Sequence, residues 1–249
     1  MTVVRRDFEL GTLFLGDVLD VLGLVRESSV DLVLTDPPYS SGGSTIETRQ
    51  RCPVEKYQNT GTKKPYPSFS GDHLDQRSYV NWCVEWGSRS RLLLKSGAVH
   101  AQFTDWRQLP ATVDAVQRAG LHWRGIVPWD KTETARPTVG GFRAQAEYLV
   151  WGSNGPLSRS RGVGCLPGAF REPVRRSDKL HVTGKPTALM VRLVAACPPN
   201  GVVADWFAGS GTTAVAAVVT GRRFIGCEVS QEYFEIACKR IHEAEARLA

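Results

Sequence analysis

Short apolar segments alternate with helical segments along this chain, and this alternation constrains the fold more than any other feature. Seven segments are rich in β-branched or aromatic residues, as strands are: LFLG, VDLVLT, AVHAQFT, WRGIVPW, AEYLVWG, VVADWF and RRFIGCE. Helical composition lies between them, over Tyr79 to Leu94, Leu109 to Ala119, Thr187 to Ala196 and Thr212 to Val219, and Ser230 suits the start of a last helix that ends near Leu248. Strands that alternate with helices indicate a mostly parallel sheet with helices on both faces.

The length of the chain fits one domain, and two stretches interrupt the alternation. Because 249 residues can bury a large core, we expect a single domain over residues 1–249. Residues 40–72 are polar and rich in Gly, Pro, Lys and Ser, which is typical of a functional loop. Residues 152–180 hold six basic and two acidic residues. This segment therefore carries most of the net charge of +6 of the chain.

The charge and the spacing of cysteines and histidines limit the kinds of site to expect. A net charge of +6 and a pI near 9.1 allow a polyanionic partner without requiring one. The six cysteines include no C-x-x-C pair and the five histidines lack metal-ligand spacing, so we expect reduced thiols and no metal. The first residues lack the apolar core of a secretory signal and no apolar run could span a membrane, so we expect a cytoplasmic protein.

The segment VVADWFAGSGTTAVAAVVTGRRFIGCE reads as a strand, a glycine loop, a helix and a second strand with an acidic end. Gly209 and Gly211 allow a tight turn and close approach of a ligand to the backbone. Glu228 lies 23 positions after Asp205, where a carboxylate can accept ribose hydroxyls. This layout is typical of nucleoside binding. The loop also fits the dinucleotide fingerprint, but too few residues follow it for a complete dinucleotide site.

The tetrapeptide Asp36-Pro37-Pro38-Tyr39 directly follows a predicted strand, at the edge of an α/β sheet where ligands bind. The two prolines have no N–H, so the turn offers carbonyl oxygens and a carboxylate. A rigid pair of acceptors can take both hydrogens of an exocyclic amine on a nucleobase, and the tyrosine ring can stack on that base. Accepting both hydrogens draws the nitrogen toward tetrahedral geometry and frees its lone pair for attack. In duplex DNA such a base must first be extruded.

These segments together resemble the S-adenosylmethionine-dependent DNA amino-methyltransferases, in the permuted group whose catalytic motif precedes the cofactor motif. TDPPY is similar to the family's catalytic motif, and DWFAGSGTT is similar to its glycine loop. The segment L-x-L-G-D, which ends at Asp17, resembles the acidic segment near the cofactor adenine. HVTGKP resembles the H-P-T-x-K-P segment, which lines the methionine end of the cofactor. LLKSGAVH, IVPWDKT and FRAQAEYLVWGS look like later strands, with Glu147 in the position of the usual acidic residue. Val182 and Trp206 depart from the pattern, because each stands where the family has proline.

The resemblance implies a fold, a reaction and a site. The fold is α/β and Rossmann-like, with a seven-stranded mostly parallel sheet, one antiparallel strand, helices on both faces, a lid or DNA-contacting loop at 40–72 and a short target-recognition insertion at 152–180. The reaction transfers a methyl group from S-adenosylmethionine to N6 of a flipped adenine in double-stranded DNA. The implied catalytic residues are Asp36, Pro37, Pro38 and Tyr39. The implied cofactor-binding residues are Asp17, Asp36, His181, Thr183, Lys185, Pro186, Asp205, Phe207, Ala208, Gly209, Ser210, Gly211, Thr212, Thr213 and Glu228. The DNA-binding residues implied by position are Arg159, Arg161, Arg171, Arg175, Arg176 and Lys179.

Several alternatives stay open. N4 methylation of cytosine needs the same acceptors, although the cytosine enzymes of the family more often carry serine where Asp36 stands. A nucleic-acid-binding module with a degenerate site is opposed by the intact motifs, and a nicotinamide-dependent oxidoreductase rests only on the loose glycine fingerprint. Methylation at carbon-5 of cytosine is disfavoured, because the chain has Cys-Pro pairs and lacks the Pro-Cys pair that this chemistry uses. A homodimer and a cognate restriction endonuclease are open as partners, and the sequence gives no membrane partner.

Overall fold

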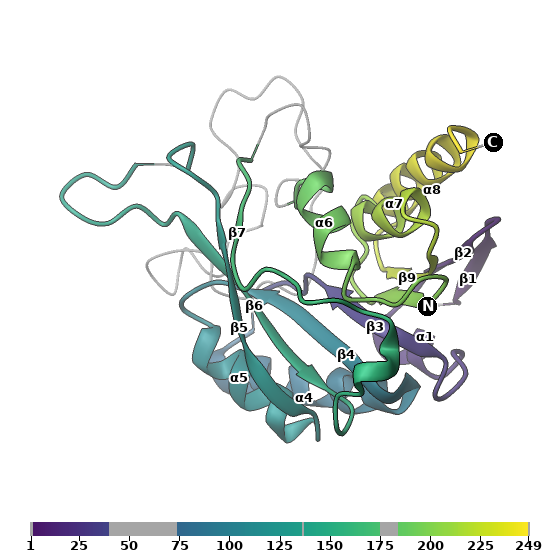
Figure 1. Ribbon diagram of the computed structural model, residues 1–249, viewed down its shortest axis with the longest axis horizontal. Helices are drawn as coiled ribbons and strands as arrows, with labels where there is room; N and C mark the ends of the chain where they lie inside the picture. The colour runs from purple at the N-terminus through teal and green to yellow at the C-terminus, as the bar shows by residue number, and fades with distance from the viewer. Residues whose placement is uncertain (1, 40–73, 136, 175–183, 249) are drawn as a thin grey trace.

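One twisted sheet forms the centre of the molecule (Figure 1). A computed structural model describes residues 2–39, 74–135, 137–174 and 184–248. The nine strands found there lie in the order β1-β2-β9-β8-β3-β4-β6-β5-β7. Their bounds are β1 (Val4–Asp7), β2 (Gly11–Leu15), β3 (Val30–Thr35), β4 (Leu94–Thr104), β5 (His122–Asp130), β6 (Ala146–Ser153), β7 (Phe170–Arg171), β8 (Val202–Asp205) and β9 (Arg223–Glu228). Every neighbouring pair is parallel except those that involve β1 or β6.

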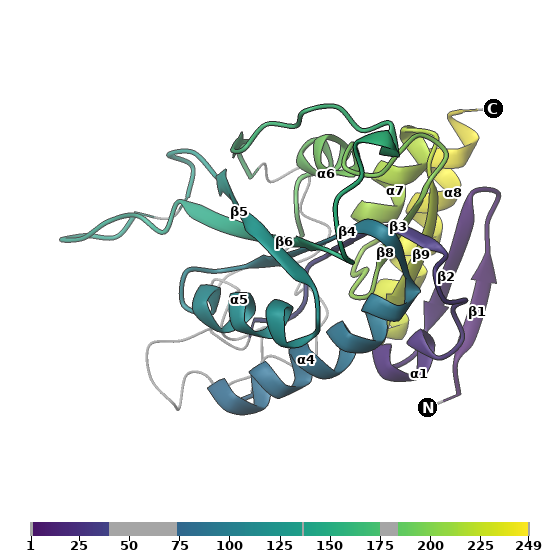
Figure 2. The ribbon, with the colours of Figure 1, turned by 60° about the horizontal axis from the view of Figure 1, so that its bottom comes forward.

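Helices cover both faces of the sheet, as Figure 2 shows. One face carries α1 (Val18–Leu22), α4 (Gln76–Leu93) and α5 (Leu109–Arg118), and the other carries α6 (Thr187–Val194), α7 (Thr212–Val219) and α8 (Gln231–Ala246). Alternate side chains of β3 supply both cores, because successive residues of a strand point to opposite faces. Leu32 and Leu34 pack in the core under α6, α7 and α8, whereas Val33 packs with Trp86 of α4.

The prediction of a mostly parallel α/β sheet with helices on both faces is confirmed, but its strand count was too low. The sheet has nine strands rather than seven in the described residues, and two of them, β1 and β6, are antiparallel to their neighbours rather than one. The strand β1 escaped prediction because its four residues are all exposed and carry no apolar alternation, and β7 has only two residues. Helix α1 was also missed, because five residues are too few to display a helical period.

Helix α4 begins earlier than predicted because of its cap. The Asp75 carboxylate accepts hydrogen bonds from the backbone N–H of Arg77 and of Ser78, at 2.9 and 3.0 Å, so the helix starts at Gln76 rather than Tyr79. The predicted loop at 40–72 lies outside the described residues.

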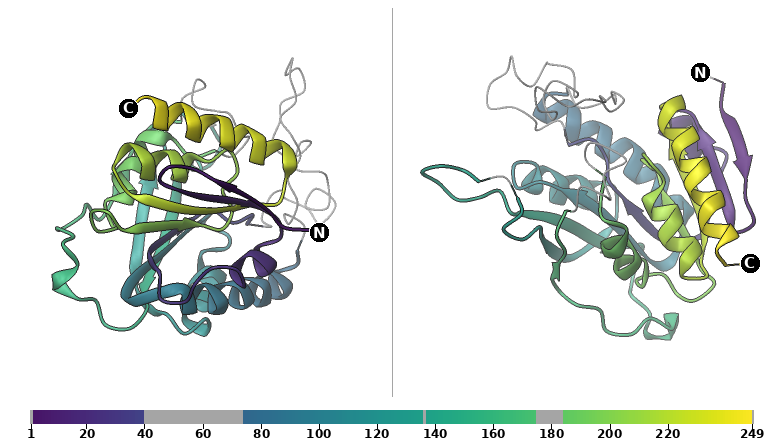
Figure 3. Two further views of the ribbon diagram at one scale, coloured as in Figure 1. Left: turned by 90° about the vertical axis from the view of Figure 1, so that its right-hand side faces the viewer. Right: turned by 90° about the horizontal axis from the view of Figure 1, so that it is seen from above.

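The C-terminal helix α8 lies beside the hairpin of β1 and β2 (Figure 3). Its Glu245 carboxylate accepts a hydrogen bond from the Leu10 backbone N–H at 3.0 Å, which fixes the helix to the turn of that hairpin. None of the helices in the described part of the chain combines the length and apolar character that a membrane span needs.

Candidate active site

The motifs from the two ends of the chain meet at one edge of the sheet. Parallel strands present their carboxyl ends at the same edge. Glu228 ends β9, Asp205 ends β8 and Asp36 directly follows β3. Because β6 runs the other way, its beginning lies at this edge too, and Glu147 is paired with Trp129 near the end of β5. With neighbouring strands about 4.8 Å apart, only about 10 Å separates β9 from β3.

One buried carboxylate joins the glycine loop to β3, the strand that directly precedes the catalytic motif. Asp205 accepts hydrogen bonds from the hydroxyl of Thr35 at 2.7 Å and from the hydroxyl of Thr213 at 2.5 Å. Its Oδ1 also accepts from the backbone N–H of Phe207 at 3.1 Å. Burial raises the pKa of Asp205 to about 6, against the opposing effect of these hydrogen bonds. Asp205 therefore holds the loop in place from inside the protein, between Thr35 next to the catalytic motif and the first turn of α7.

The acidic end of β9 faces the same loop. Glu228 accepts from the Gly209 N–H at 2.7 Å and from the Ser230 N–H at 2.8 Å, one on each carboxylate oxygen. Burial raises its pKa to about 6. Since each carboxylate oxygen can accept two hydrogen bonds, Glu228 keeps acceptor capacity for hydroxyl groups of a ligand. These spare acceptor positions fit the hydroxyl groups of a ribose.

The turn of the loop requires glycine. Gly209 and Gly211 have φ values of 52° and 78°, in the left-handed region. A Cβ at Gly211 would lie 2.9 Å from the Cβ of Ala237 on α8, so a side chain there would displace the helix. The residue that follows each glycine is held from outside the loop. Arg240 of α8 donates to the hydroxyl groups of Ser210 and Thr212, at 3.0 and 3.1 Å. Sequence analysis gave no sign of this arginine.

The catalytic motif lies in a cluster of charged side chains. The Tyr39 hydroxyl donates to Asp36 Oδ1 at 2.5 Å. Lys185 Nζ donates to Asp36 Oδ2 at 2.5 Å, to the Tyr39 hydroxyl at 3.1 Å and lies 3.2 Å from Glu147 Oε2. Lys131 Nζ donates to Glu147 Oε1 at 3.1 Å. This set, which we call the catalytic cluster, consists of Asp36, Tyr39, Lys131, Glu147 and Lys185.

Burial and charge oppose each other within the catalytic cluster. Burial raises the pKa of Asp36 and outweighs the lowering effect of the Lys185 ammonium. For Glu147 the balance is reversed: the two lysines hold its pKa below the usual range in spite of burial. Burial disfavours the charged form of Lys185, yet Asp36 and Glu147 hold the pKa of its ammonium above its usual value. Burial also raises the pKa of Tyr39, so its hydroxyl stays protonated and donates.

The residues predicted for the site do not include Lys131, and Glu147 is noted there only as standing in the position of the family's usual acidic residue. Both lie near an end of a strand at this edge of the sheet. Lys131 directly follows β5, and Glu147 is the second residue of β6, the neighbouring antiparallel strand. Lys185 is predicted to bind the cofactor, and the structure places its ammonium on Asp36 and Tyr39 of the catalytic motif. Pro37 is buried and Pro38 half-buried. Pro186 is buried at the start of α6.

The remaining predicted cofactor residues are placed as follows. Asp17 is exposed after β2 and caps α1, since its carboxylate accepts from the Leu19 N–H at 2.8 Å. Phe207 packs against Trp82 and Trp86, with ring centroids 5.3 Å apart in both cases. Ala208 donates its N–H to the Cys227 carbonyl at 2.8 Å. His181 and Thr183 lie outside the described residues, as does the departure at Val182.

Trp206, which departs from the family pattern, packs into the core. Its indole is buried on the face that carries α4, where Nε1 donates to the Ser90 hydroxyl at 2.7 Å. The side chain therefore packs away from Asp205 and Glu228.

Of the predicted DNA-binding residues that the structure describes, Arg159 and Arg161 lie at the opposite edge, whereas Arg171 lies near this one. Arg161 donates to the backbone carbonyls of Asp31 at 3.3 Å and Ala196 at 2.9 Å, at the start of β3, about 16 Å along that strand from Asp36. We therefore withdraw Arg161 from the residues expected to contact DNA, because the chain between β6 and β7 begins at the opposite edge. Arg159 lies in the same short turn. Arg171 is exposed near the site and pairs with Asp130 at 3.3 Å and Glu133 at 3.0 Å. Arg175, Arg176 and Lys179 lie outside the described residues.

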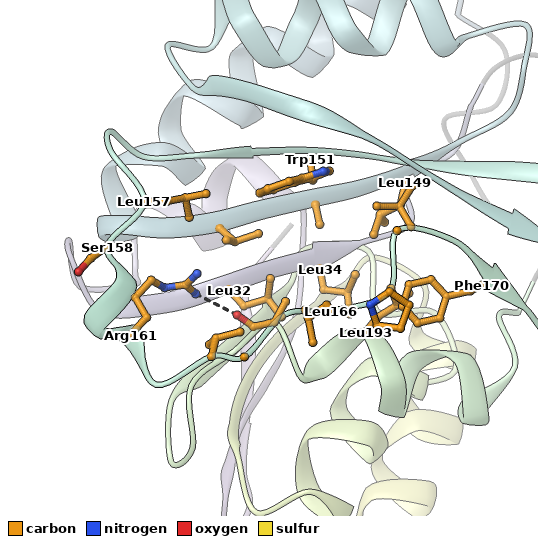
Figure 4. Close-up of a pocket in the computed structure, with 18 residues that line it drawn as sticks. Leu32, Leu34, Leu149, Trp151, Leu157, Ser158, Arg161, Leu166, Phe170 and Leu193 are labelled. Atoms are coloured by element: carbon orange, nitrogen blue, oxygen red, sulfur yellow. Dashed lines mark hydrogen bonds between the residues drawn. The ribbon is translucent and has the colours of Figure 1, made fainter.

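A hollow of about 350 Å³ lies beneath the segment that leads from β6 to β7 (Figure 4). Its walls include Leu32 and Leu34 of β3, Leu149 and Trp151 of β6, and Leu193 of α6. Its lining contains no carboxylate, so it offers no strong acceptor for an amine and is separate from the catalytic cluster. Among the described residues, no group of three His, Cys, Asp or Glu side chains could hold a metal ion.

The chain is similar to known DNA methylases over most of its length. Residues 30–160 and 166–239 match the model of the N6/N4 DNA methylase family, described as DNA methylase. The type II methyltransferase M2.DpnII of Streptococcus pneumoniae is 28% identical over 249 residues, which cover 92% of this chain and 88% of that protein.

Two solved structures share the fold. The complex of M1.HpyAVI with S-adenosylmethionine matches with a TM-score of 0.66 and 21% identity over 93% of this chain and 98% of that one. The cytosine-N4-specific PvuII DNA methyltransferase matches with a TM-score of 0.70 and 18% identity over 96% and 93%. With the glycine loop and the catalytic motif side by side on the sheet edge, and with most of its residues covered by the family model, the chain belongs to the N6/N4 DNA methylase family.

Proposed function

We propose that this chain transfers a methyl group from S-adenosylmethionine to N6 of an adenine extruded from double-stranded DNA. The observation that carries the proposal is the hydrogen-bonded link from Thr35 through Asp205 to Thr213. It fixes the amine acceptor Asp36 beside the glycine loop. Holding the two reacting groups in one geometry supplies much of the rate in a direct transfer that has no covalent enzyme intermediate.

The residues present fit the cofactor. Glu228 has acceptor capacity for the ribose hydroxyls, and the Gly209–Gly211 turn admits a ligand close to the backbone. Asp17 follows β2, the strand next to β9, and is proposed for the adenine end. When bound, S-adenosylmethionine supplies a methyl group on a positively charged sulfur, which an amine lone pair can attack.

Asp36 and the Pro37 carbonyl are proposed to accept the two hydrogens of the target amine. Tyr39 offers the face of its ring to the extruded base, and its hydroxyl bond to Asp36 fixes both groups relative to each other. As the new bond forms, positive charge develops on the amine nitrogen. The Asp36 carboxylate stabilises that charge without having to reorient, and the amine then releases one proton to solvent.

Adenine is favoured over cytosine because an aspartate, Asp36, begins the acceptor motif. N4 methylation of cytosine is the second candidate, since the same acceptors suit its amine and the fold matches that of a cytosine-N4-specific enzyme. Incubation with labelled S-adenosylmethionine and unmethylated DNA, followed by nucleoside mass analysis, separates the two. We expect N6-methyladenine. N4-methylcytosine as the sole product would replace the proposal with its alternative, and no labelled base at all would refute both.

Sequence recognition is proposed for the basic segment at residues 152–180, within a single domain that includes the loop at 40–72. Its phosphate contacts would come from Arg171 and from the cations that follow it, Arg175, Arg176 and Lys179. A homodimer and a cognate restriction endonuclease stay predictions.

A further inference from the structure

We infer that Lys131, acting through Glu147, is a positioning residue that keeps the Lys185 ammonium on Asp36 and so keeps Asp36 an acceptor for the target amine. The inference rests on the proposed function for the identity of that amine. It concerns two residues that do not themselves reach the reacting atoms: Glu147, which contacts Asp36 only through Lys185 and Tyr39, and Lys131 behind it.

The hydrogen bonds of Lys185 are fully committed. An ammonium group has three hydrogens, and Lys185 Nζ has three oxygen partners: Asp36 Oδ2 at 2.5 Å, the Tyr39 hydroxyl at 3.1 Å and Glu147 Oε2 at 3.2 Å. The rings of Phe103 and Tyr39 flank it, with centroids 4.9 and 5.4 Å from the nitrogen. Its side chain is only 6% exposed. Lys185 therefore acts through Asp36 and Tyr39, and its position depends on the oxygen that Glu147 supplies.

Glu147 is itself held from the other side. Its Oε1 accepts from Lys131 Nζ at 3.1 Å, while Oε2 faces Lys185. The side chains of Lys131 and Glu147 are 18% and 19% exposed, so water screens this pair only partly. Charges of opposite sign alternate along the series Lys131, Glu147, Lys185 and Asp36, and its two cations balance its two anions.

Removing Lys131 and removing Glu147 should shift the charge of Asp36 in opposite directions. Besides Lys185, the groups that face Asp36 are Tyr39 on its own segment, Glu147 on β6 and Asp205 at the end of β8. Without the Lys131 cation, the cluster holds one excess negative charge, which favours a proton on a carboxylate. Without the Glu147 anion, it holds one excess positive charge, which favours ionised Asp36. A protonated Asp36 presents a donor where the amine needs an acceptor.

The test is the pH dependence of kcat for methyl transfer at saturating DNA and cofactor, where changes in cofactor affinity do not contribute. Lys131→Met should move the acid limb of the profile upward by about one pH unit, and Glu147→Gln should move it downward. Lys131→Arg should restore the wild-type limb. Lys95→Met is the matched control, because Lys95 pairs with Asp31 at 2.8 Å at the opposite end of β3. It should leave the limb in place.

A second measurement needs no turnover. Carbon-13 NMR of the Asp36 carboxyl group, assigned by its loss in Asp36→Asn, should show its titration shifting in the same opposite directions in protein without DNA. If wild-type enzyme methylates DNA but both variants keep the wild-type limb and titration, the inference is wrong and the proposed function stands. If the NMR shifts appear but the wild-type enzyme methylates nothing, the proposed function fails and the role of Lys131 in the cluster stands.

Discussion

The two halves of the active edge stabilise buried carboxylates in different ways. In the cofactor half, Asp205 and Glu228 are bound by hydroxyl and backbone N–H groups, and burial raises the pKa of each to about 6. In the base half, Asp36 and Glu147 are bound by Lys185 and Lys131.

This difference separates two requirements of the reaction. Carboxylates that are bound by neutral donors have no partner cation of their own, which suits a ligand that carries a positive charge. An acceptor for an amine must stay ionised when the site closes over a base and excludes water, and a neighbouring ammonium maintains that charge. The comparison predicts that the two halves respond separately to mutation and differently to pH.

The largest effect should come from the base half. Asp36→Ala removes the charged acceptor of the target amine and leaves the glycine loop intact, so methyl transfer should fall on the order of 100- to 1,000-fold, as for loss of a preorganised electrostatic partner. Affinity for S-adenosylmethionine, measured by calorimetry, should be nearly unchanged. Turnover within a few-fold of wild type would show that Asp36 does not accept the amine.

In the cofactor half, Glu228→Ala should weaken S-adenosylmethionine binding by about 1.5–3 kcal/mol, the range for hydrogen bonds to a charged group, which is roughly 10- to 150-fold. Glu245→Ala is the matched control. Glu245 also accepts a hydrogen bond from a backbone N–H, that of Leu10, but at the start of β2, away from the edge that holds Glu228, so its loss should leave cofactor affinity unchanged. An unchanged dissociation constant for Glu228→Ala would remove Glu228 from the cofactor site.

The tyrosine connects a stacking role with an electrostatic one. Tyr39→Ala should cost about 1–3 kcal/mol in binding of the extruded base, the range for base–aromatic stacking. Sequence alone predicts a much milder Tyr39→Phe. Because the hydroxyl donates to Asp36 and accepts from Lys185, we now expect Tyr39→Phe to keep DNA affinity but lower kcat. Equal DNA affinity and equal kcat in Tyr39→Phe and wild type would show that the hydroxyl is dispensable.

The smallest effect is a pH dependence confined to the cofactor half. Since the pKa of Glu228 is about 6, its acceptor charge is lost as the pH falls below that value, and cofactor affinity should decline by up to about tenfold per pH unit there. Glu228→Gln should show a flat profile of cofactor affinity against pH.

The stability of the fold should depend on pH in the opposite direction. Because folding raises the pKa of Asp205 and Glu228, their contribution to the free energy of unfolding is present below pH 4 and is lost as the pH rises through about 6.

The sequence predicted the meeting of the motifs because parallel strands place their carboxyl ends together whatever their order along the chain. Asp36, Gly209 and Gly211 follow strands with a clear apolar pattern and Glu228 ends one, so their place at the edge could be inferred. The partner of the Lys185 ammonium could not be inferred from the sequence, because strand patterns do not say which way a long side chain turns.

For the predicted DNA-binding segment, position in the chain does not give position in space. The chain leaves β6 at the edge opposite Asp36, so the short turn that holds Arg159 and Arg161 lies there, and Arg161 binds backbone carbonyls. The antiparallel direction of β6 decides this, and composition does not reveal it. Lys131 was missed for a related reason, since its significance depends on Glu147 of the neighbouring strand.

The bond of Asp205 to both Thr35 and Thr213 has a thermodynamic consequence. A ligand that shifts the first turn of α7 pulls on the same carboxylate that anchors the end of the catalytic strand, so the two substrates share a coupling free energy. Such coupling is reciprocal: whatever factor a bound cofactor adds to the affinity for DNA, bound DNA must add to the affinity for the cofactor. Asp205 would in this way link the two affinities, in whichever order the reactants bind.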